Sequence, residues 1–304
     1  MNVAKNKNGN PYLNWEEGVI SITKNTKNNG VLGFGLVNKD IAKEIIVNNH
    51  YSKKWNTQFG LINIGVYKES ELLGVASFGR MMNPKSYKKI VDSENIDSVL
   101  ELNRLWIDDQ LGKNTETILV SMSMKYIKNN HPHVLAIQSF ADGRLGCGTI
   151  YKASNFKYYG FKKSIFFENI KTGEIFHKVP LENTKRPTGF KRLNLMYIKG
   201  ELKPLEVKTY RYIYPLQKNV QIKLKEKPYP EYEKGYEYIS YKPTCNQIFK
   251  LWYILQAQSD HENLETVTIY LRQNYEESEL IKSNENAKKY FQKNHDILGR
   301  ASRL

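Results

Sequence analysis

Apolar residues near the start of the chain recur at the spacing of a helix. Ile41, Ile45 and Ile46 fall on one face of a segment that Asp40 can cap. The segment closes near Asn49, where polar residues follow one another. We therefore predict a helix from Asp40 to about Asn49 that buries one face.

The apolar runs that follow predict strands. Residues 59–67 partly alternate, and residues 72–78 come after a short polar turn, so the two segments are expected to pair as neighbouring strands. Residues 100–107 predict a third strand. The nearly continuous apolar run at residues 134–141 is typical of a strand that is buried on both faces.

Helical spacing returns between the third strand and the buried strand. Apolar residues four apart, from Ile118 to Tyr126, mark one face of a central helix. After the buried strand we predict a short helix over residues 151–156, a strand at 159–168 and its partner at 175–179. This order indicates the α/β class, with a mixed central sheet flanked by helices.

The C-terminal part of the chain has a different pattern. It begins with a charged linker that contains Tyr and Pro, and a mainly helical region follows. Its helices are predicted at residues 246–256, 261–274 and 279–294. The predicted domains are an N-terminal arm at 1–37, a catalytic domain at 38–220, and the linker with its helical region at 221–304.

The charge is distributed unevenly along the chain. The net charge is +15, but residues 221–304 hold 13 basic and 12 acidic side chains and are nearly neutral. Residues 178–218 hold 10 basic and 3 acidic side chains. The aromatic residues interleaved with them are Phe190, Tyr197, Tyr210, Tyr212 and Tyr214. Such a segment suits a nucleic acid, although a Lys/Asn/Ile-rich composition can also reflect an AT-rich genome.

The composition argues against a membrane or secreted protein. No window approaches the roughly 18 consecutive apolar residues that a membrane span needs. The segment from Met1 to Trp15 is polar and lacks the apolar stretch of a signal peptide. Cys147 and Cys245 match no metal or redox spacing, so a reducing cytoplasm is expected.

Five short motifs occur in order between the first helix and the last predicted strands. They are His50-Tyr-Ser-Lys-Lys54, Leu73-Gly-Val-Ala-Ser-Phe-Gly79, Glu101-Leu-Asn-Arg-Leu105, Phe140-Ala-Asp-Gly143 and Gly148-Thr-Ile-Tyr-Lys-Ala-Ser-Asn-Phe156. With the order of elements, they resemble the bacteriophage Mom family of DNA adenine modification proteins, which have a GNAT acyltransferase-like fold. The resemblance covers residues 38–216 and departs from the family at Cys147, where a residue such as His is common.

The resemblance implies an enzyme that acts on the N6 amine of adenine in double-stranded DNA. The family's product is N6-carbamoylmethyl adenine, which protects phage DNA from restriction. By this resemblance we expect a GNAT-like transferase in the cytoplasm of an infected or lysogenic bacterial host, with double-stranded DNA as its partner.

His50 and Asp142 are the first catalytic candidates. A neutral imidazole can take a proton from a reacting amine, whereas the structural alternative is a histidine that caps the preceding helix. Asp142 ends the buried strand where α/β sheets place functional groups, and it can orient His50, accept a proton or help to hold a metal. Its alternative role is an Asp-Gly turn or an N-cap.

Tyr51, Tyr151 and Arg104 complete the catalytic candidates. Tyr51 adjoins His50 within the first motif, and Tyr151 can act as an acid or stack on a base, with core packing as its alternative. Arg104 lies in an otherwise apolar strand close to Glu101. A buried arginine needs an ion pair or an anion such as a phosphate or carboxylate.

Two candidate cofactors follow from the resemblance and from the chemistry, an acyl-CoA and a metal. By resemblance, acyl-CoA would place its pyrophosphate on the backbone at the start of the central helix, where Gly112, Lys113 and Asn114 lie. A plain surface loop is the alternative there. A metal such as iron is a second candidate cofactor, because adenine N6 is a weak nucleophile, but the sequence does not identify its ligands.

A reaction at adenine N6 requires that the base leave the duplex stack. We expect Tyr51, Trp55 and Tyr151 to support the extruded base. The side chains expected to contact backbone phosphates are Lys53, Lys54, Arg80, Lys191 and Arg192. Trp55 is expected to bind the DNA beside them, through a base.

Two other functions stay open at this point. One is a GNAT N-acyltransferase for a protein or small-molecule amine, and the other is a non-catalytic DNA-binding or structural phage protein. The basic segment at 178–218 favours the DNA enzyme. The nearly neutral C-terminal helices favour a homo-oligomer or another protein contact over a grip on the DNA backbone.

Overall fold

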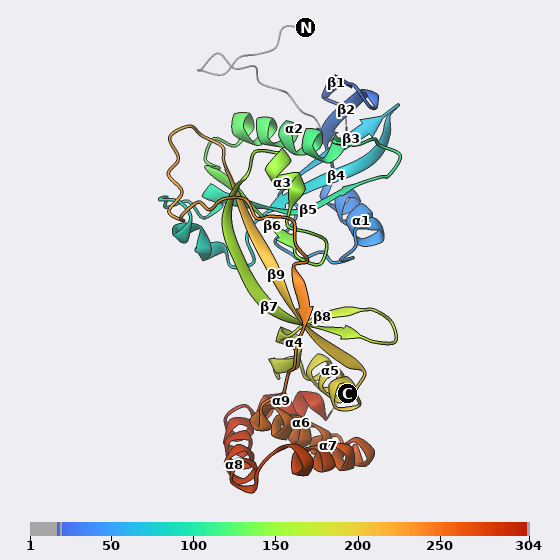
Figure 1. Ribbon diagram of the computed structural model, residues 1–304, viewed down its shortest axis with the longest axis vertical. Coiled ribbons are helices and arrows are strands. Elements are labelled where there is room, and N and C mark those ends of the chain that lie inside the picture. The colour runs from blue at the N-terminus through green and yellow to red at the C-terminus, as the bar shows by residue number, and fades with distance from the viewer. Residues whose placement is uncertain (1–16, 19, 303–304) are drawn as a thin grey trace. The chain divides into compact units, whose positions relative to one another are not determined.

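The computed structural model describes residues 17–18 and 20–302, and it divides the chain into two compact units (Figure 1). Unit 1 comprises residues 1–162 and 209–233, and unit 2 comprises residues 163–208 and 234–304. Two of the three unit boundaries fall inside long strands, β7 (Lys157–Asn169) and β9 (Leu202–Pro215), and the third follows Glu233. The predicted boundary after residue 220 is not among them.

Unit 1 is built on a mixed sheet in the strand order β1-β2-β3-β4-β5-β6-β9, with β7 next to β9. The strands are β1 (Ile22–Thr26), β2 (Gly30–Leu36), β3 (Ile62–Lys68), β4 (Glu71–Gly79), β5 (Val99–Ile107) and β6 (Ala136–Asp142). Pairing is antiparallel from β1 to β5, parallel between β5 and β6, and antiparallel between β6 and β9. The predicted mixed α/β sheet is confirmed, but β1 and β2 extend it into the segment predicted as an arm.

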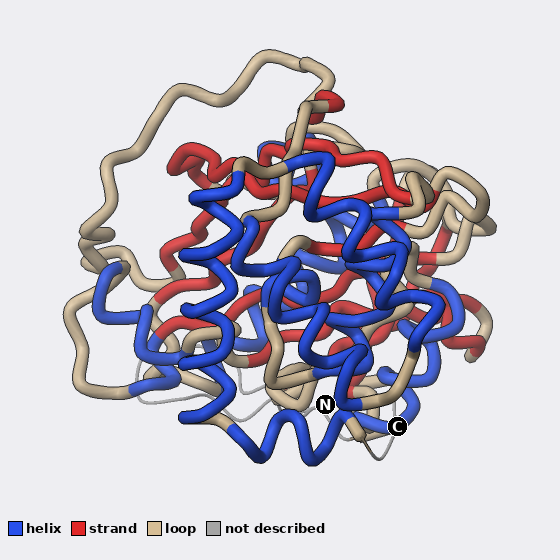
Figure 2. The backbone as a smooth tube through the Cα atoms, turned by 90° about the horizontal axis from the view of Figure 1, so that it is seen from below, coloured by secondary structure: helices blue, strands red, loops and turns tan. Residues whose placement is uncertain are grey.

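Helices cover both faces of this sheet. Successive side chains of a strand point to opposite faces, so neighbouring residues of β4 show which helix lies on each face. On β4, Val75 packs in one cluster with Ala42 of α1 (Lys39–Asn49). The next residue, Ala76, packs in the main core with Leu119 of α2 (Thr115–Asn130). Figure 1 labels both helices beside strands of this unit, and Figure 2 gives a second view of the backbone coloured by helix, strand and loop. Thus α1 and α2 lie on opposite faces.

The start of α1 differs slightly from the prediction. The capping residue is Asn38, whose side-chain oxygen accepts a hydrogen bond from the backbone N–H of Asp40 at 2.8 Å. Asp40 instead lies in the first turn, where its negative charge favours the helix. His50 follows the last helical residue and begins the loop that leads to the site.

The parallel strands β5 and β6 separate after three paired positions. The last pair joins Glu101 to Gln138, although β5 continues to Ile107 and β6 to Asp142. Just past this point, the Ser139 hydroxyl donates a hydrogen bond to the Leu102 carbonyl at 3.1 Å and so replaces a backbone partner.

Short elements connect the strands of unit 1, and helices dominate unit 2. The connecting elements in unit 1 are the 3-10 turns at Pro84–Lys89 and Ile96–Ser98, and helix α3 (Thr149–Ala153). Unit 2 contains β8 (Ile175–His177), α4 (Val179–Glu182), α5 (Pro187–Ile198), β10 (Tyr236–Tyr238), α6 (Cys245–Ala257), α7 (His261–Asn274), α8 (Glu277–Lys293) and α9 (His295–Ala301). The predicted helical C-terminal region is confirmed. Across the described residues, no helix has the length and apolar character needed to cross a membrane.

Helix α5 joins the core of the C-terminal helices. Phe190 of α5 is 1% exposed and packs in one cluster with Ile248, Leu251 and Val267. Two buried side-chain amides also contact each other: Gln247 Nε2 donates to Asn194 Oδ1 at 2.7 Å. The helical region predicted to begin after residue 221 therefore needs α5 to complete its core.

The aromatic residues of the basic segment are mostly interior. Phe190, Tyr210 and Tyr212 are 1%, 0% and 1% exposed, so these rings cannot stack on bases. The segment forms α5 and β9, neither of which was predicted. Tyr210 and Tyr212 face the interior from β9, with the less buried Arg211 between them, and this corrects the interpretation of these rings as a base-binding surface.

Gly79, at the end of β4, allows the loop after α1 to approach the sheet. A Cβ atom at this position would lie 2.6 Å from Asn103 Oδ1 and 2.9 Å from the Cα atom of Phe59, and it would also meet the Gln58 carbonyl. Real Cβ atoms do not come this close to backbone atoms. Glycine at this position therefore fixes the loop that carries His50 against β4 and β5.

We predict that Gly79→Ala lowers the free energy of unfolding by about 1–3 kcal/mol, since the added methyl group meets fixed backbone atoms. The matched control is Gly189→Ala in α5, where a new Cβ has no atom within 4 Å. Alanine is favoured over glycine in helices, so the control should gain up to about 1 kcal/mol. Urea unfolding followed by circular dichroism measures both, and equal stability of the two variants would contradict the steric account.

Candidate functional site

Charged and polar side chains from five elements gather around the separated ends of β5 and β6. They are His50 and Tyr51 after α1, Glu101 and Arg104 on β5, Asp142 on β6, Tyr151 on α3 and Arg211 on β9. Electrostatic interactions couple them, since Tyr51 interacts with both Arg104 and Asp142, and Arg104 also interacts with Glu101 and Tyr151. All of these residues belong to unit 1.

Glu101 occupies the point where the two strands part. Its carboxylate accepts hydrogen bonds from the Asn103 amide at 3.2 Å and from the Gln138 amide at 3.3 Å. Burial raises the pKa of Glu101, while these two hydrogen bonds and the charges of Arg104 and Arg211 oppose the rise. A carboxyl group with a raised pKa beside other charged side chains is a candidate for proton transfer.

Arg104 lies beside Glu101, and no carboxylate of the described residues forms an ion pair with it. Its Nε donates to the Lys54 carbonyl at 3.1 Å, and its Nη1 donates to the Asn103 carbonyl at 2.6 Å. The guanidinium also lies 4.7 Å from the ring centroid of Phe59. Because burial lowers the pKa of Arg104 and two carbonyls fix its orientation, the guanidinium is placed to bind an anion.

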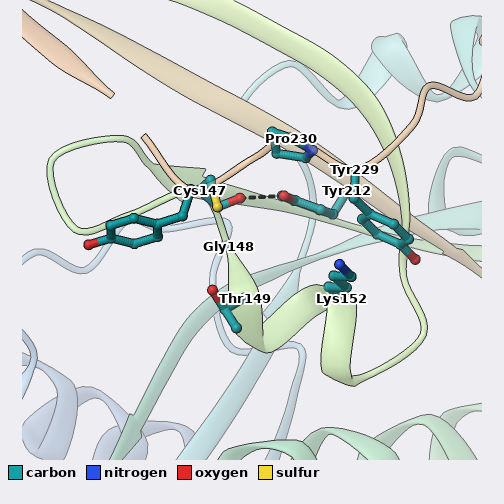
Figure 3. A pocket seen from close by; sticks show the side chains of 8 residues that line it. Cys147, Gly148, Thr149, Lys152, Tyr212, Tyr229 and Pro230 are labelled. Atoms are coloured by element: carbon teal, nitrogen blue, oxygen red, sulfur yellow. Dashed lines mark hydrogen bonds between the residues drawn. The ribbon is translucent and has the colours of Figure 1, made fainter. Parts of the chain in front are cut away.

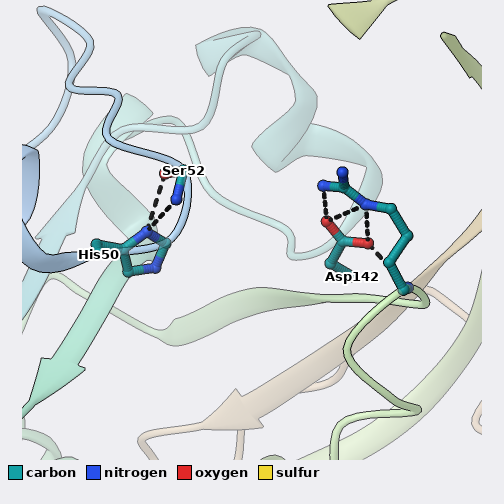
Figure 4. A network of polar contacts seen from close by, with 4 residues as sticks. His50, Ser52 and Asp142 are labelled. Atoms are coloured by element: carbon teal, nitrogen blue, oxygen red, sulfur yellow. Dashed lines mark hydrogen bonds and ion pairs between the residues drawn. The ribbon is translucent and has the colours of Figure 1, made fainter. Parts of the chain in front are cut away.

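His50 is buried and held by Ser52 (Figure 4). The Ser52 backbone N–H donates to Nδ1 at 3.1 Å, and the Ser52 hydroxyl lies 2.9 Å from the same nitrogen. Nδ1 therefore keeps its lone pair, and in the neutral ring the proton is on Nε2. Burial, and next Arg104, lower the pKa of His50 to about 4.

These contacts do not support the predicted role of His50 as a general base. The basic nitrogen already accepts the Ser52 N–H, and the other nitrogen carries the proton. With a pKa of about 4, the ring stays neutral near pH 7. His50 can instead donate one hydrogen bond from Nε2.

Asp142 is paired with Arg144 and does not contact His50 (Figure 4). Arg144 Nε donates to both carboxylate oxygens at 2.9 and 3.1 Å, and Nη2 makes a further close contact. The Arg144 backbone N–H also donates to Asp142 Oδ1 at 3.0 Å, so the carboxylate supports the turn after β6. The expectation that Asp142 orients His50 does not hold, since each has another partner.

Tyr51 links the two sides of the site. Its ring centroid lies 4.3 Å from that of His50, and its side chain is 58% exposed. Loss of water around the hydroxyl and then the charge of Asp142 raise the pKa of Tyr51, and Arg104 and Arg144 oppose the rise. The phenol is therefore neutral near pH 7, and its ring is accessible.

Tyr151 belongs to the interior wall of the site. Its ring stacks on Tyr212 with centroids 5.1 Å apart and contacts the edge of Phe156. Its hydroxyl lies 2.9 Å from Ser139 Oγ and 3.4 Å from the Phe140 carbonyl. Burial raises the pKa of Tyr151 to about 12. These contacts favour packing, the structural alternative, over stacking on a substrate base.

In the loop before α2, the first of the three residues predicted to bind the pyrophosphate is engaged within the fold. The backbone N–H of Gly112 donates to the Asn29 side chain at 2.5 Å, and the Asn28 amide donates to the Lys113 carbonyl at 3.2 Å. Asn114 is the residue before the helix and has the left-handed φ of 72°. The turn between β1 and β2 thus covers this loop, and Gly112 has no N–H left for a phosphate.

No group of three or more metal-binding side chains occurs among residues 17–18 and 20–302. Asp142 already binds Arg144, and His50 Nδ1 already accepts from Ser52. His131 and His133 lie at a turn before β6 with their rings 5.8 Å apart. The described residues therefore offer no clustered ligand set for a metal.

The predicted phosphate contacts of unit 1 differ in their availability. Lys53 and Lys54 are exposed beside the site, and Lys53 has the left-handed φ of 46°. Trp55 packs against the edge of Phe59 and in an apolar cluster, so it supports the loop. Arg80 forms a two-pronged ion pair with Asp97 at 2.7 and 2.9 Å.

Lys191 and Arg192 lie in unit 2. Lys191 forms an ion pair with Asp260 at 2.7 Å and donates to Gln258, and Arg192 lies 5.1 Å from the ring centroid of Phe176. Lys191 is thus engaged within its own unit. Its role as a phosphate contact stays a prediction without a supporting contact in the structure.

Glu101 and Arg144 were not selected from the sequence as site residues. Glu101 belongs to one of the five motifs, and a glutamate in an apolar strand beside an arginine was the available signal. Arg144 follows Asp142 by two residues, a spacing at which an aspartate often accepts the backbone N–H. The pairing of β5 and β6 that brings Glu101 to Gln138 could not be seen in the sequence.

Comparisons with solved structures find acetyltransferases of low sequence identity. A GNAT-family protein described as a putative acetyltransferase from Desulfovibrio desulfuricans is 6% identical, covers 61% of this chain and 99% of its own, and has a TM-score of 0.34. An N-acetyltransferase from Staphylococcus aureus Mu50 is 14% identical, covers 61% and 97%, and has a TM-score of 0.35.

Comparisons with protein families and characterised sequences give a closer match. The model of the Mom protein family matches residues 31–231, which include every residue of the site. The methylcarbamoylase Mom of Escherichia phage Mu is 33% identical over 198 residues, which are 63% of this chain and 80% of the relative. The chain therefore belongs to the Mom protein family.

Proposed function

We propose that this protein modifies the N6 amine of adenine in double-stranded DNA and that the group it installs is carbamoylmethyl. Family membership and the methylcarbamoylase of phage Mu support the reaction class. The observation that carries the assignment is the Glu101 carboxyl group at the separation of β5 and β6, with the Arg104 guanidinium beside it. These two groups provide a proton acceptor and an anion site where the two strands part.

The first requirement is extrusion of the target base from the duplex, at a cost of a few kcal/mol. The ring of Tyr51 is exposed and interacts electrostatically with Arg104, so an extruded base can stack on it beside the site. Lys53 and Lys54 follow it directly and are exposed, so they suit the flanking phosphates. Tyr151 and Trp55 are engaged in packing and support this surface from within.

The second requirement is removal of a proton from a weak nucleophile. The new bond joins N6 to an electrophilic carbon of the donor, and the N6 proton passes to the Glu101 carboxylate. The leaving group departs from the donor with the bonding electrons. A carboxylate whose pKa is raised by burial is a stronger base than an exposed one, which suits this step.

Arg104 and His50 then act on the other reactant. The Arg104 guanidinium can bind an anionic or carbonyl oxygen of the donor, and His50 can donate from Nε2. Both groups have fixed orientations, because Lys54 and Asn103 carbonyls hold the arginine and Ser52 holds the imidazole. Fixed donors require little reorganisation when charge develops on the donor.

An acyl-CoA is a poor candidate for the donor of a carbamoylmethyl group. An acyl-CoA reacts at its carbonyl carbon, whereas a carbamoylmethyl group is attached through its methylene carbon. A single acyl transfer therefore gives a different product. The covered loop at Gly112 agrees with this, since it leaves no free N–H there for a pyrophosphate.

We predict that Glu101→Gln reduces modification about 100-fold to 10,000-fold while DNA binding is retained, because the amide keeps the shape but cannot accept the proton. Nucleoside mass spectrometry of plasmid DNA incubated with the purified protein measures the modified adenine. Glu71→Gln, at the exposed start of β4, is the matched control and should act as wild type. Full activity of Glu101→Gln would remove the carboxylate from the mechanism.

The pH dependence should report the same group. The base must be ionised, so the rate should fall as the pH drops through the raised pKa of Glu101, at a higher pH than the value of about 4.3 for a free glutamate. His50, with a pKa of about 4, stays neutral over this range and should not shape it. Single-turnover rates measured from about pH 5 to pH 8 test this. A rate that does not change with pH would count against Glu101 as the base.

A further inference from the structure

A recess lies in unit 1 at the start of α3 (Figure 3). It has a volume of about 150 Å³. Its lining comes from the start of α3, from β9 and from the segment after it: Cys147, Gly148, Thr149, Lys152, Tyr212, Tyr229, Pro230 and Tyr232. None of the predicted site residues lines it, so it is separate from the site around Glu101.

The walls of this recess are rings. Figure 3 shows Tyr229, Pro230 and Tyr212 around the same space, with Lys152 pointing toward it. Tyr232 also lines the recess and is 82% exposed, so its ring stands at the rim. Among these rings Tyr229 and Tyr232 have accessible area, and a flat ligand can stack on them, because stacking needs a planar face on both partners.

The inner wall is fixed in place by the fold. The Tyr229 hydroxyl donates to the Phe156 carbonyl at 2.5 Å, and the Tyr212 hydroxyl donates to the Cys147 carbonyl. Gly148 has a φ of 92°, and a Cβ atom there would lie 2.6 Å from the Tyr212 ring. The inner wall of the recess is therefore preformed, and exposed side chains such as Tyr232 stand at its rim.

The charge of the lining is positive. Lys152 is the one charged side chain among the described residues that line the recess, and its Nζ lies 5.2 Å from the ring centroid of Tyr229. No described carboxylate forms an ion pair with it. Aromatic rings together with a lysine are the combination that holds single-stranded nucleic acid, where the bases stack and the backbone meets the cation.

The recess has the size of one ring system. A cavity of about 150 Å³ in another protein binds benzene, so this volume admits a single flat heterocycle and excludes a stacked pair. It is also connected to the site, because Tyr212 stacks on Tyr151 at 5.1 Å and the Tyr151 hydroxyl lies 2.9 Å from Ser139 at the strand separation. One aromatic stack thus separates the recess from the site.

We propose that this recess binds a nucleobase of the DNA strand that neighbours the target adenine, and that it thereby sets the sequence context of modification. This inference rests on the proposed action on DNA. The ring of Tyr232 stacks on the neighbouring base, and Lys152 contacts its phosphate or an acceptor on its edge.

The test compares Tyr232→Ala with Tyr232→Phe, which keeps the ring. Tyr238→Ala, a 45% exposed tyrosine in unit 2, is the matched control. The substrates are duplexes with one adenine between randomised bases, and sequencing with mass spectrometry gives the modified fraction for each context. Tyr232→Ala should lose the preference at one flanking position and raise KM about 5-fold or more, whereas Tyr232→Phe and Tyr238→Ala should match wild type.

A binding measurement separates this inference from the proposed function. Titration of the full-length protein with each deoxynucleoside monophosphate, followed by tyrosine fluorescence, should show saturable quenching that Tyr232→Ala lacks and Tyr238→Ala keeps. Absence of quenching in the wild type, or an unchanged context preference in Tyr232→Ala, would overturn the recess as a base site. A wild type that binds nucleotides but leaves all DNA unmodified would instead overturn the proposed reaction.

Discussion

The separation of two parallel strands is the constraint on which the site depends. Because β5 and β6 pair at only three positions, the side chains of the site gather where the two strands part. Every residue of β6 pairs with a residue of β9, which holds β6 from the other side. Glu101 is on the last paired position, and Ser139 satisfies the first free carbonyl beyond it. A half-buried carboxyl group is thus placed at the point where the sheet opens.

The hydrogen bonds around this recess divide the chemical roles among its residues. Asp142 is bound by Arg144, and His50 by Ser52, so neither is free to accept a proton. Glu101 contacts only amide groups among its described hydrogen-bond partners and keeps a raised pKa. The same local hydrogen bonds that fix the turns after α1 and β6 therefore occupy His50 Nδ1 and the Asp142 carboxylate, which is why we propose Glu101 as the proton acceptor.

Sequence patterns predicted the elements whose periodicity is strong. The hairpin, the central helix, the buried strand and the C-terminal helices follow from apolar spacing alone, and the motifs identified the family. β9 and α5 were missed because their many lysines and arginines made residues 178–218 look like a binding surface. In β9 less buried charged residues such as Lys208 and Arg211 stand between interior ones such as Val207, Tyr210 and Tyr212, as in a half-buried strand. Partners such as Arg144 for Asp142 depend on side-chain geometry, which spacing does not reveal.

The central claim is that adenine N6 meets Glu101 between the separated strands. The most direct measurement is a crystal structure of the Glu101→Gln variant bound to a duplex that contains the target adenine. The account predicts an extruded base stacked on Tyr51, with N6 within hydrogen-bond distance of the residue 101 side chain. An adenine that remains stacked in the duplex, or that is bound away from β5 and β6, would contradict it.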